Sequence, residues 1–269
     1  MARKLGENTI ILENKPKIIS YGSIVGKKEH EGPLSKEFDL YITDCYFGEK
    51  TFEKAESKLQ KTAVEIAMKK VNLTEKEIDK IFAGDLLNQC IGTFFGLKDF
   101  RIPLIGLYGA CSTMALSTAL ASIFVDCKIA DKAVAVTSSH YCSAERQYRF
   151  PLDYGSQRTP TAQWTVTGSG AVILSSEGTG PYINAVSFGV IEDFGIKDAN
   201  NMGAAMAPDD VKIRPYPKNE GMVFFYTQIQ YLRGFRALFK DFLMRKTVEK
   251  SVNEIYAQSR NYYKKEEEF

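Results

Sequence analysis

Residues 104–125, LIGLYGACSTMALSTALASIFV, constrain the fold more than any other part of the sequence. They predict a short apolar strand, a tight turn at Gly109 and a helix that begins near Cys111. Apolar side chains fall on every side of this helix and are spaced by Ala and Ser, which is typical of a buried central helix. Its apolar run, about twelve residues, is too short to cross a bilayer.

Cys111 lies where the turn meets the predicted helix. A cysteine in the first turn of a helix is at the positive end of the helix dipole, which lowers the pKa of its thiol and favours the nucleophilic thiolate. The alternative is a structural cysteine that packs as a small apolar side chain. Position alone leaves both interpretations open.

Apolar periodicity predicts further elements on both sides of this stretch. Residues 51–71 have a helical pattern with one apolar face and with Lys and Glu opposite, and Thr74 and Glu77 have the spacing of a capping box. Residues 87–92 are predicted to be a loop. Apolar runs predict strands at 9–12, 17–21, 80–86, 104–107, 133–138 and 170–175. Helices that alternate with such strands indicate an α/β protein with a mostly parallel or mixed sheet, covered on both faces.

The longest predicted loop, 139–167, contains His140, Arg146, Arg149, Arg158 and Trp164. Arginine is suited to planar, bidentate recognition of carboxylates, so the cluster predicts a site for an aromatic or acyl anion. The alternative is that these arginines tie the loop to itself or to a second subunit.

Charge and composition exclude several classes of function. A net charge of +2 is too small to indicate nucleic-acid binding. An odd number of cysteines, five, suits a reducing compartment, and the presence of only two histidines argues against a zinc site. The glycines at 168 and 170 precede a strand, so no dinucleotide loop is expected. We therefore expect no metal and no cofactor, and, because residues 1–10 lack an apolar signal core, no export.

Several segments resemble known proteins. The turn GACST at 109–113 resembles the nucleophile turn of the thiolase superfamily, notably its ketoacyl synthase III branch. More closely, residues 47–56, 108–117, 138–174 and 200–208 resemble the stage V sporulation protein AD family. This resemblance extends to Pro208 and is not seen beyond it.

The resemblance implies a thiolase-like layered α-β-α fold of two similar halves. Residues 1–180 correspond to a complete first half and 181–208 to the start of the second half. Residues 209–269 form an unmatched basic and aromatic tail, so the second half is expected to be truncated or divergent.

The family implies a non-catalytic subunit of the SpoVA assembly that binds dipicolinic acid, pyridine-2,6-dicarboxylate, and acts in sporulation and germination. Its implied partners are dipicolinic acid and other SpoVA proteins. Whether a calcium ion accompanies the ligand and whether the protein forms a homodimer are left open. Its implied location is the spore inner membrane, as a peripheral protein without a transmembrane segment. The expected ligand-binding residues are Cys111, His140, Arg146, Arg149 and Arg158.

The alternative function is a thiolase-like or ketoacyl synthase III-like acyltransferase with Cys111 as its nucleophile. Enzymes of the superfamily pair this cysteine with histidines, or a histidine and an asparagine, from the second half, which serve as general base and oxyanion hole. This chain has no histidine after His140, and His140 does not match those catalytic histidines. A thiol without a base lacks the usual activated pair, so we expect a binding protein.

The tail contains a second pattern at 222–246, where aromatic residues are mixed with Arg and Lys. Leu232, Phe235, Leu238 and Phe242 have helical spacing, which predicts a basic amphipathic helix that docks on a membrane or a partner. The alternative is a tail read from a shifted or rearranged frame. Without a second half, an apolar face lacks its cover, so we expect lower stability than in a full-length relative and weak or no binding of dipicolinic acid.

Overall fold

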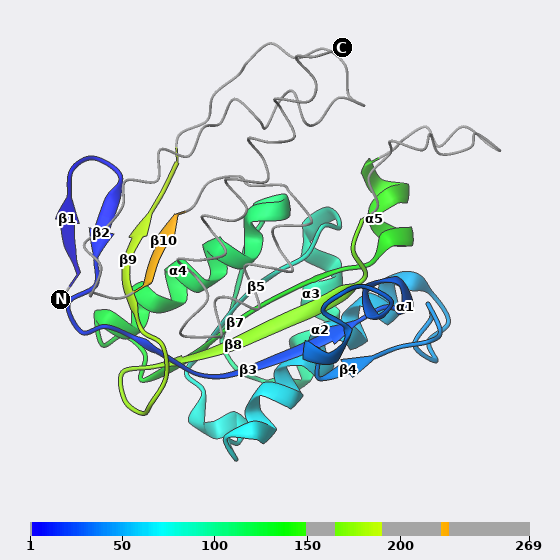
Figure 1. Cartoon of the computed structure of the whole chain (residues 1–269), viewed down its shortest axis with the longest axis horizontal. Helices are drawn as coiled ribbons and strands as arrows, with labels where there is room; N and C mark the ends of the chain where they lie inside the picture. Colours follow the sequence, from blue (N-terminus) through cyan, green and yellow to red (C-terminus); the bar gives the residue numbers. More distant parts are fainter. Residues whose placement is uncertain (1, 149–164, 190–221, 226–269) are drawn as a thin grey trace, which may run out of the picture. The chain divides into compact units, whose positions relative to one another are not determined.

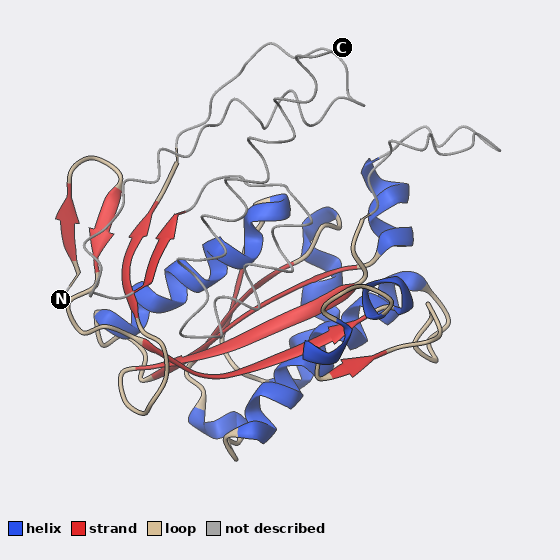
Figure 2. Ribbon diagram, viewed as in Figure 1, coloured by secondary structure: helices blue, strands red, loops and turns tan. Residues whose placement is uncertain are grey.

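The computed structural model describes residues 2–148, 165–189 and 222–225, all within one compact unit, Met1–Gln228 (Figures 1 and 2). The strands are β1 (Arg3–Leu5), β2 (Thr9–Ile11), β3 (Lys17–Val25), β4 (Leu40–Tyr41), β5 (Lys80–Gly84), β6 (Leu104–Gly106), β7 (Lys132–Ser139), β8 (Gly168–Ser175), β9 (Ile183–Ser187) and β10 (Met222–Phe225). The helices are α1 (Lys27–His30), α2 (Phe52–Lys70), α3 (Ile91–Leu97), α4 (Thr113–Asp126) and α5 (Tyr141–Tyr148). Short 3-10 turns cover Ser35–Glu37, Glu75–Glu77, Asn88–Cys90, Lys98–Phe100 and Ala110–Ser112.

The larger sheet has six strands in the order β4-β3-β8-β7-β5-β6. Neighbours β5, β6 and β7 are parallel, as are β3 and β4. Strand β8 runs antiparallel to both β3 and β7. The prediction of a mostly parallel or mixed sheet is confirmed.

Helices cover both faces of this sheet, as Figure 1 shows. Helix α2 packs on β3, β8 and β7, with α3 beside it, whereas α4 packs on β7 and β5 from the other side. Strand β5 has helices on both of its faces. Ile81 belongs to the core beneath α2, and the ring centroids of Phe82 and Phe124 of α4 are 4.9 Å apart. The layered α-β-α arrangement is confirmed for the described residues.

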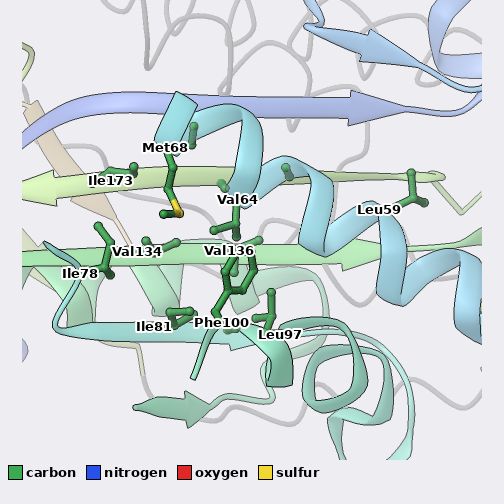
Figure 3. Close-up of a cluster of buried hydrophobic side chains, with 14 of the residues drawn as sticks. Leu59, Val64, Met68, Ile78, Ile81, Leu97, Phe100, Val134, Val136 and Ile173 are labelled. Atoms are coloured by element: carbon green, nitrogen blue, oxygen red, sulfur yellow. The ribbon is translucent and has the colours of Figure 1, made fainter. Parts of the chain in front are cut away.

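The main core lies between α2 and the sheet (Figure 3). Leu59, Val64 and Met68 of α2 pack against Val136 of β7 and Ile173 of β8. The helix begins where the Thr51 side chain accepts a hydrogen bond from the Lys54 amide, and it ends in a basic turn that suits the helix dipole. Burying this apolar face is the main contribution to its stability.

Most predicted elements are present within a few residues of their expected ends. The helix predicted at 51–71 is α2, and the strands predicted at 17–21, 80–86, 104–107, 133–138 and 170–175 are β3, β5, β6, β7 and β8. The helix predicted from Cys111 is α4, which is largely buried. The capping box is formed as predicted, since the Thr74 amide donates to Glu77 Oε2 at 2.8 Å ahead of a 3-10 turn.

Two predicted loops are wrong in part, because each contains a helix. The segment 87–92 leads directly into α3, a short helix whose Phe94 and Phe95 are exposed and therefore give no amphipathic signal. The first residues of the long loop 139–167 form α5. Arg149, Arg158 and Trp164, also predicted to lie in that loop, are outside the described residues.

A second sheet has the order β1-β2-β9-β10. Its last strand, Met222–Phe225, comes from the predicted tail and pairs in parallel with β9, whereas the tail pattern had suggested only a helix. The amphipathic helix expected around Leu232–Phe242 lies outside the described residues. The domain boundaries at 180 and 208 stay predictions.

Candidate functional site

The candidate site lies at one edge of the larger sheet, where three parallel strands end. Strand β5 is followed by Asp85, β6 by the turn that contains Cys111, and β7 by His140. Because parallel strands end at the same edge, these residues follow one another along it. Ligands in α/β proteins commonly bind outside the carboxyl ends of the strands.

The turn before α4 is tightly bonded to itself. The Gly109 amide donates to Thr113 Oγ1 at 3.1 Å, and the same hydroxyl donates to the Ala110 carbonyl at 2.7 Å. Ala110 has a φ of 48°, which is unusual for a residue with a side chain. Such strained residues cluster at functional sites, so the geometry of this turn marks Cys111 as a candidate.

The Cys111 side chain is exposed, but the protein around it still removes part of its hydration. This loss raises the pKa of the Cys111 thiol, and the residue's own amide only partly opposes the rise. The expectation of a lowered pKa is wrong, because Cys111 lies in the 3-10 turn Ala110–Ser112 and α4 begins only at Thr113. At neutral pH the group is therefore a thiol that is open to solvent.

A second strained turn faces the first. Gln89 and Cys90 have φ values of 58° and 51°, and Cys90 Sγ donates to the Leu107 carbonyl at 3.4 Å. The Tyr108 hydroxyl lies 3.5 Å from the Leu86 carbonyl. Burial, followed by the nearby Cys90, Asp85 and Cys111, raises the pKa of Tyr108. These four groups therefore form one cluster, which the sequence alone did not suggest.

Asp85 anchors this cluster from the end of β5. Its side chain is 1% exposed, and its Oδ1 accepts from the Leu87 amide at 2.7 Å. Its Oδ2 accepts from both the amide and the hydroxyl of Thr93, each at 2.6 Å. The carboxylate thus joins the end of β5 to the first turn of α3 and shapes the loop that faces Cys111.

A second buried acid, Glu56 of α2, lies behind Asp85. Its oxygens lie 3.2 Å from Ser138 Oγ and 2.7 Å from Ser143 Oγ. Burial raises the pKa of Glu56 to about 8; the hydrogen bond from Ser143 opposes the rise, and the charge of Asp85 adds to it. The predicted charged face of α2 is therefore wrong at Glu56, which has no exposure.

His140 is completely buried at the end of β7. Its Nε2 lies 2.8 Å from the Cys45 carbonyl, so it carries the proton, while Nδ1 accepts from the Cys142 amide at 3.2 Å. Burial lowers the pKa of His140, which keeps the ring neutral. Both nitrogens are engaged, and the ring stacks on Phe52 with centroids 5.1 Å apart. The structure thus gives His140 a role in positioning α5, and ligand contact by His140 stays a prediction.

The structure brings Cys111 together with Cys90, Tyr108 and Asp85. His140 follows β7, which pairs with β5 and ends at the same edge of the sheet. Arg146 lies on α5, the helix that follows His140. Arg149 and Arg158 are outside the described residues. Within the described ranges, His, Cys, Asp and Glu side chains form no group of three that could hold a metal ion.

Comparison with known proteins gives a family. Residues 6–216 match the family model of stage V sporulation protein AD. The match therefore continues past Pro208, beyond which no resemblance was expected from the sequence. The chain is 42% identical over 203 residues to stage V sporulation protein AD of Bacillus subtilis (strain 168), an alignment that covers 76% of this chain. The chain spans 60% of the length of that relative.

Among solved structures, the chain is similar to 3-oxoacyl-[acyl-carrier-protein] synthase III from Aquifex aeolicus VF5, with 17% identity, a TM-score of 0.42 and coverage of 60% of this chain and 53% of that one. It is also similar to a variant of OleA from Xanthomonas campestris, with 12% identity, a TM-score of 0.41 and coverage of 62% and 56%. Scores of this size are weak, and the assignment rests on the match to the family model and to the Bacillus relative. On that match, the chain belongs to the stage V sporulation protein AD family.

Proposed function

We propose that this chain is a non-catalytic subunit of the SpoVA assembly that binds dipicolinic acid during sporulation and germination. The observation that carries the proposal is its membership of the stage V sporulation protein AD family. The site supports it in two ways: Cys111 is exposed at the carboxyl edge of the sheet, and the chain that follows β7 brings arginines, which suit a dicarboxylate.

Direct titration tests the proposal. Calorimetry of the purified chain with dipicolinate, and separately with the isomeric pyridine-3,5-dicarboxylate, is expected to give saturable heat only with the first. Repeating the titration with calcium shows whether the metal accompanies the ligand. The absence of saturation in both titrations would contradict the proposal for this chain and would favour the other expectation from the sequence, that of weak or no binding.

Cys111→Ala is expected to weaken dipicolinate binding by about 1 kcal/mol, as for one lost polar contact. The fold should persist, because the thiol is exposed and the turn is held by hydrogen bonds of Gly109, Ala110 and Thr113. Calorimetry measures the change. Cys127→Ala at the far end of α4 is the matched control, and an unchanged affinity in Cys111→Ala would remove Cys111 from the site.

Alanine at Arg146, Arg149 or Arg158 is expected to cost about 1.5–3 kcal/mol of binding free energy in at least one of the three variants, since a charge-assisted contact to carboxylate is lost. Calorimetry again gives the affinity, with circular dichroism as a check of folding. Arg3→Ala, at an exposed residue paired with Glu13, is the control. Parental affinity in all three would assign the arginines to the scaffold or to a subunit contact.

The second candidate function is acyl transfer by Cys111, favoured by one observation: the thiol is exposed on a strained turn. Against it, the pKa of the Cys111 thiol is raised, and each of the two histidines has another neighbour. His30 stacks on Tyr41 at 3.6 Å, and both nitrogens of His140 are bonded. Incubation with an acyl-CoA, followed by mass spectrometry of the Cys111 peptide, distinguishes the two functions.

We further propose a peripheral location at the spore inner membrane, held by other SpoVA proteins. In the part of the chain that the structure describes, no helix has the length and hydropathy needed to cross a bilayer. Co-purification from membranes of sporulating cells, with and without a carbonate wash, tests whether partner proteins hold the chain there.

A further inference from the structure

The acid Glu56 lies where four elements meet. It belongs to α2, and its carboxyl oxygens lie beside Ser138 at the end of β7 and Ser143 on α5. From α3, a Cβ atom built on Gly92 would lie 3.6 Å from Glu56 Cγ and 3.2 Å from Asp85 Oδ2, so the α3 backbone closes over both acids. Glu56 has no exposure to solvent.

The hydrogen bonds around Glu56 can all be formed when it is protonated, although a bond donated by Ser143 by itself favours the ionised form. Ser143 Oγ lies 2.7 Å from Glu56 Oε2 and 3.1 Å from the His140 carbonyl, but the hydroxyl has a single hydrogen to donate. A protonated Glu56 donates to Ser143 Oγ and leaves the Ser143 hydrogen for the His140 carbonyl, so both contacts are hydrogen bonds. An ionised Glu56 takes the Ser143 hydrogen, and the contact to His140 is lost.

The charges around Glu56 favour the same state. Among described residues, Asp85 is the charged group that acts on Glu56, and its negative charge repels that of an ionised Glu56. The groups that hydrogen-bond to the carboxyl are neutral: Ser138 of β7 and Ser143 of α5. No cation compensates an ionised Glu56 among these contacts, so ionisation is costly.

We propose that Glu56 is a buried proton-binding site whose proton holds the start of α5 against α2 and β7. Loss of the proton places an uncompensated charge between these elements. The Ser143 hydroxyl then donates to the carboxylate instead of the His140 carbonyl, and the buried charge favours a state in which α5 moves away and water reaches Glu56. Because Arg146 lies on α5, proton binding at Glu56 controls the helix that carries this arginine. This mechanism does not depend on which ligand Arg146 binds.

The direction of the pH dependence follows from the two pKa values. The pKa of Glu56 is about 8 in the folded chain against 4.5 for an ordinary glutamate, so the folded state binds the proton more tightly. The resulting stabilisation is fully present below the unfolded pKa and is lost progressively as the pH rises through the folded pKa.

Amide hydrogen exchange tests the proposal on the full chain, measured by mass spectrometry from about pH 6 to about pH 9.5 and corrected for intrinsic exchange. Protection of the peptide 141–148 is expected to fall by up to about tenfold per pH unit as the pH rises towards the Glu56 pKa of about 8, and to level off above it. Glu56→Gln, whose amide can donate to Ser143 at every pH, should show no such fall. Glu65→Gln, at an exposed position of the same helix, should behave as the parent.

Two results would overturn the proposal: protection of 141–148 in the parent that does not change with pH, or an equal fall in Glu56→Gln. Infrared spectroscopy of the parent decides the matter even if Glu56→Gln fails to fold. The band of a protonated carboxyl in a dry environment is expected at about pH 6 and should disappear as the pH passes about 8. Absence of that band at the lower pH would also refute the proposal.

Discussion

Gly84→Ala is expected to leave little folded protein, with a loss of about 3 kcal/mol or more in the free energy of unfolding. Gly84 is the last residue of β5, and the chain that follows β6 passes close to its backbone. A methyl group at Gly84 would overlap the Leu107 carbonyl oxygen and would lie 2.6 Å from Thr113 Cγ2. The main obstacle is backbone that begins the Cys111 turn, so no change of rotamer relieves it. Urea unfolding followed by circular dichroism measures the loss.

Gly106→Ala is the matched control, one strand away. Its new methyl group would lie 2.9 Å from Phe94 Cζ, and its nearest neighbours are all atoms of that ring. The Phe94 side chain is half exposed and can move, so we expect a loss below about 1 kcal/mol. Similar stability in the two variants would show that β5 and the Cys111 turn do not approach each other as described.

Much of this fold follows from local patterns. The apolar runs at β5, β7 and β8 are continuous because these strands are covered on both faces, and such runs are recognisable without a structure. The missed helices are short and depend on tertiary contacts. Helix α3 exposes Phe94 and Phe95, so its sequence lacks the one-sided apolar pattern that predicts a helix.

The site was predicted less well, because burial of polar groups has no simple signature in sequence. The helical pattern predicts only an apolar face of α2 with Lys and Glu opposite, yet Glu56 and Gln60 are completely buried. A signal was available: these residues precede Leu59 and Ala63 by three residues each, which places them on the apolar face of the helix. Asp85 carried a second signal, since it follows a buried strand directly.

The Cys111 pKa shows the limit of reasoning from a helix start. The helix dipole lowers the pKa of a thiol only when the cysteine is in the first turn of the helix. Here the 3-10 turn Ala110–Ser112 comes first, and α4 begins at Thr113. A displacement of two residues is within the ordinary uncertainty of helix ends. Loss of hydration is the main cause of the raised pKa of Cys111, and the residue's own amide opposes it.

Asp85→Ala is expected to destabilise the chain by about 3–5 kcal/mol, because it leaves buried donors without an acceptor. The amides of Leu87 and Thr93 and the Thr93 hydroxyl all donate to this carboxylate. Asp85→Asn should recover part of the loss, since its amide oxygen can still accept while its NH₂ group meets another donor. Urea unfolding gives the free energies, and the exchange rates of the Leu87 and Thr93 amides should increase most.

Asp99→Ala provides the control for Asp85→Ala, since Asp99 is an exposed aspartate that pairs with Lys61 at 3.0 Å. An exposed ion pair contributes little, so this variant should lose less than about 1 kcal/mol. The contrast separates a carboxylate that holds β5 to α3 from one that only pairs at the surface. Equal stability of the Asp85 and Asp99 variants would contradict the buried network on which the Cys111 loop depends.

The same substitution connects Asp85 to the proton site. The charge of Asp85 is one of the causes that raise the pKa of Glu56, so Asp85→Asn should lower that pKa while the core stays folded. Because an ionised Glu56 is then less costly inside the folded chain, the loss of α5 protection with rising pH should be smaller than in the parent and should level off at a lower pH. Hydrogen exchange of the peptide 141–148 measures the shift, and a loss of protection that continues to a higher pH in Asp85→Asn would show that the two acids do not interact as described.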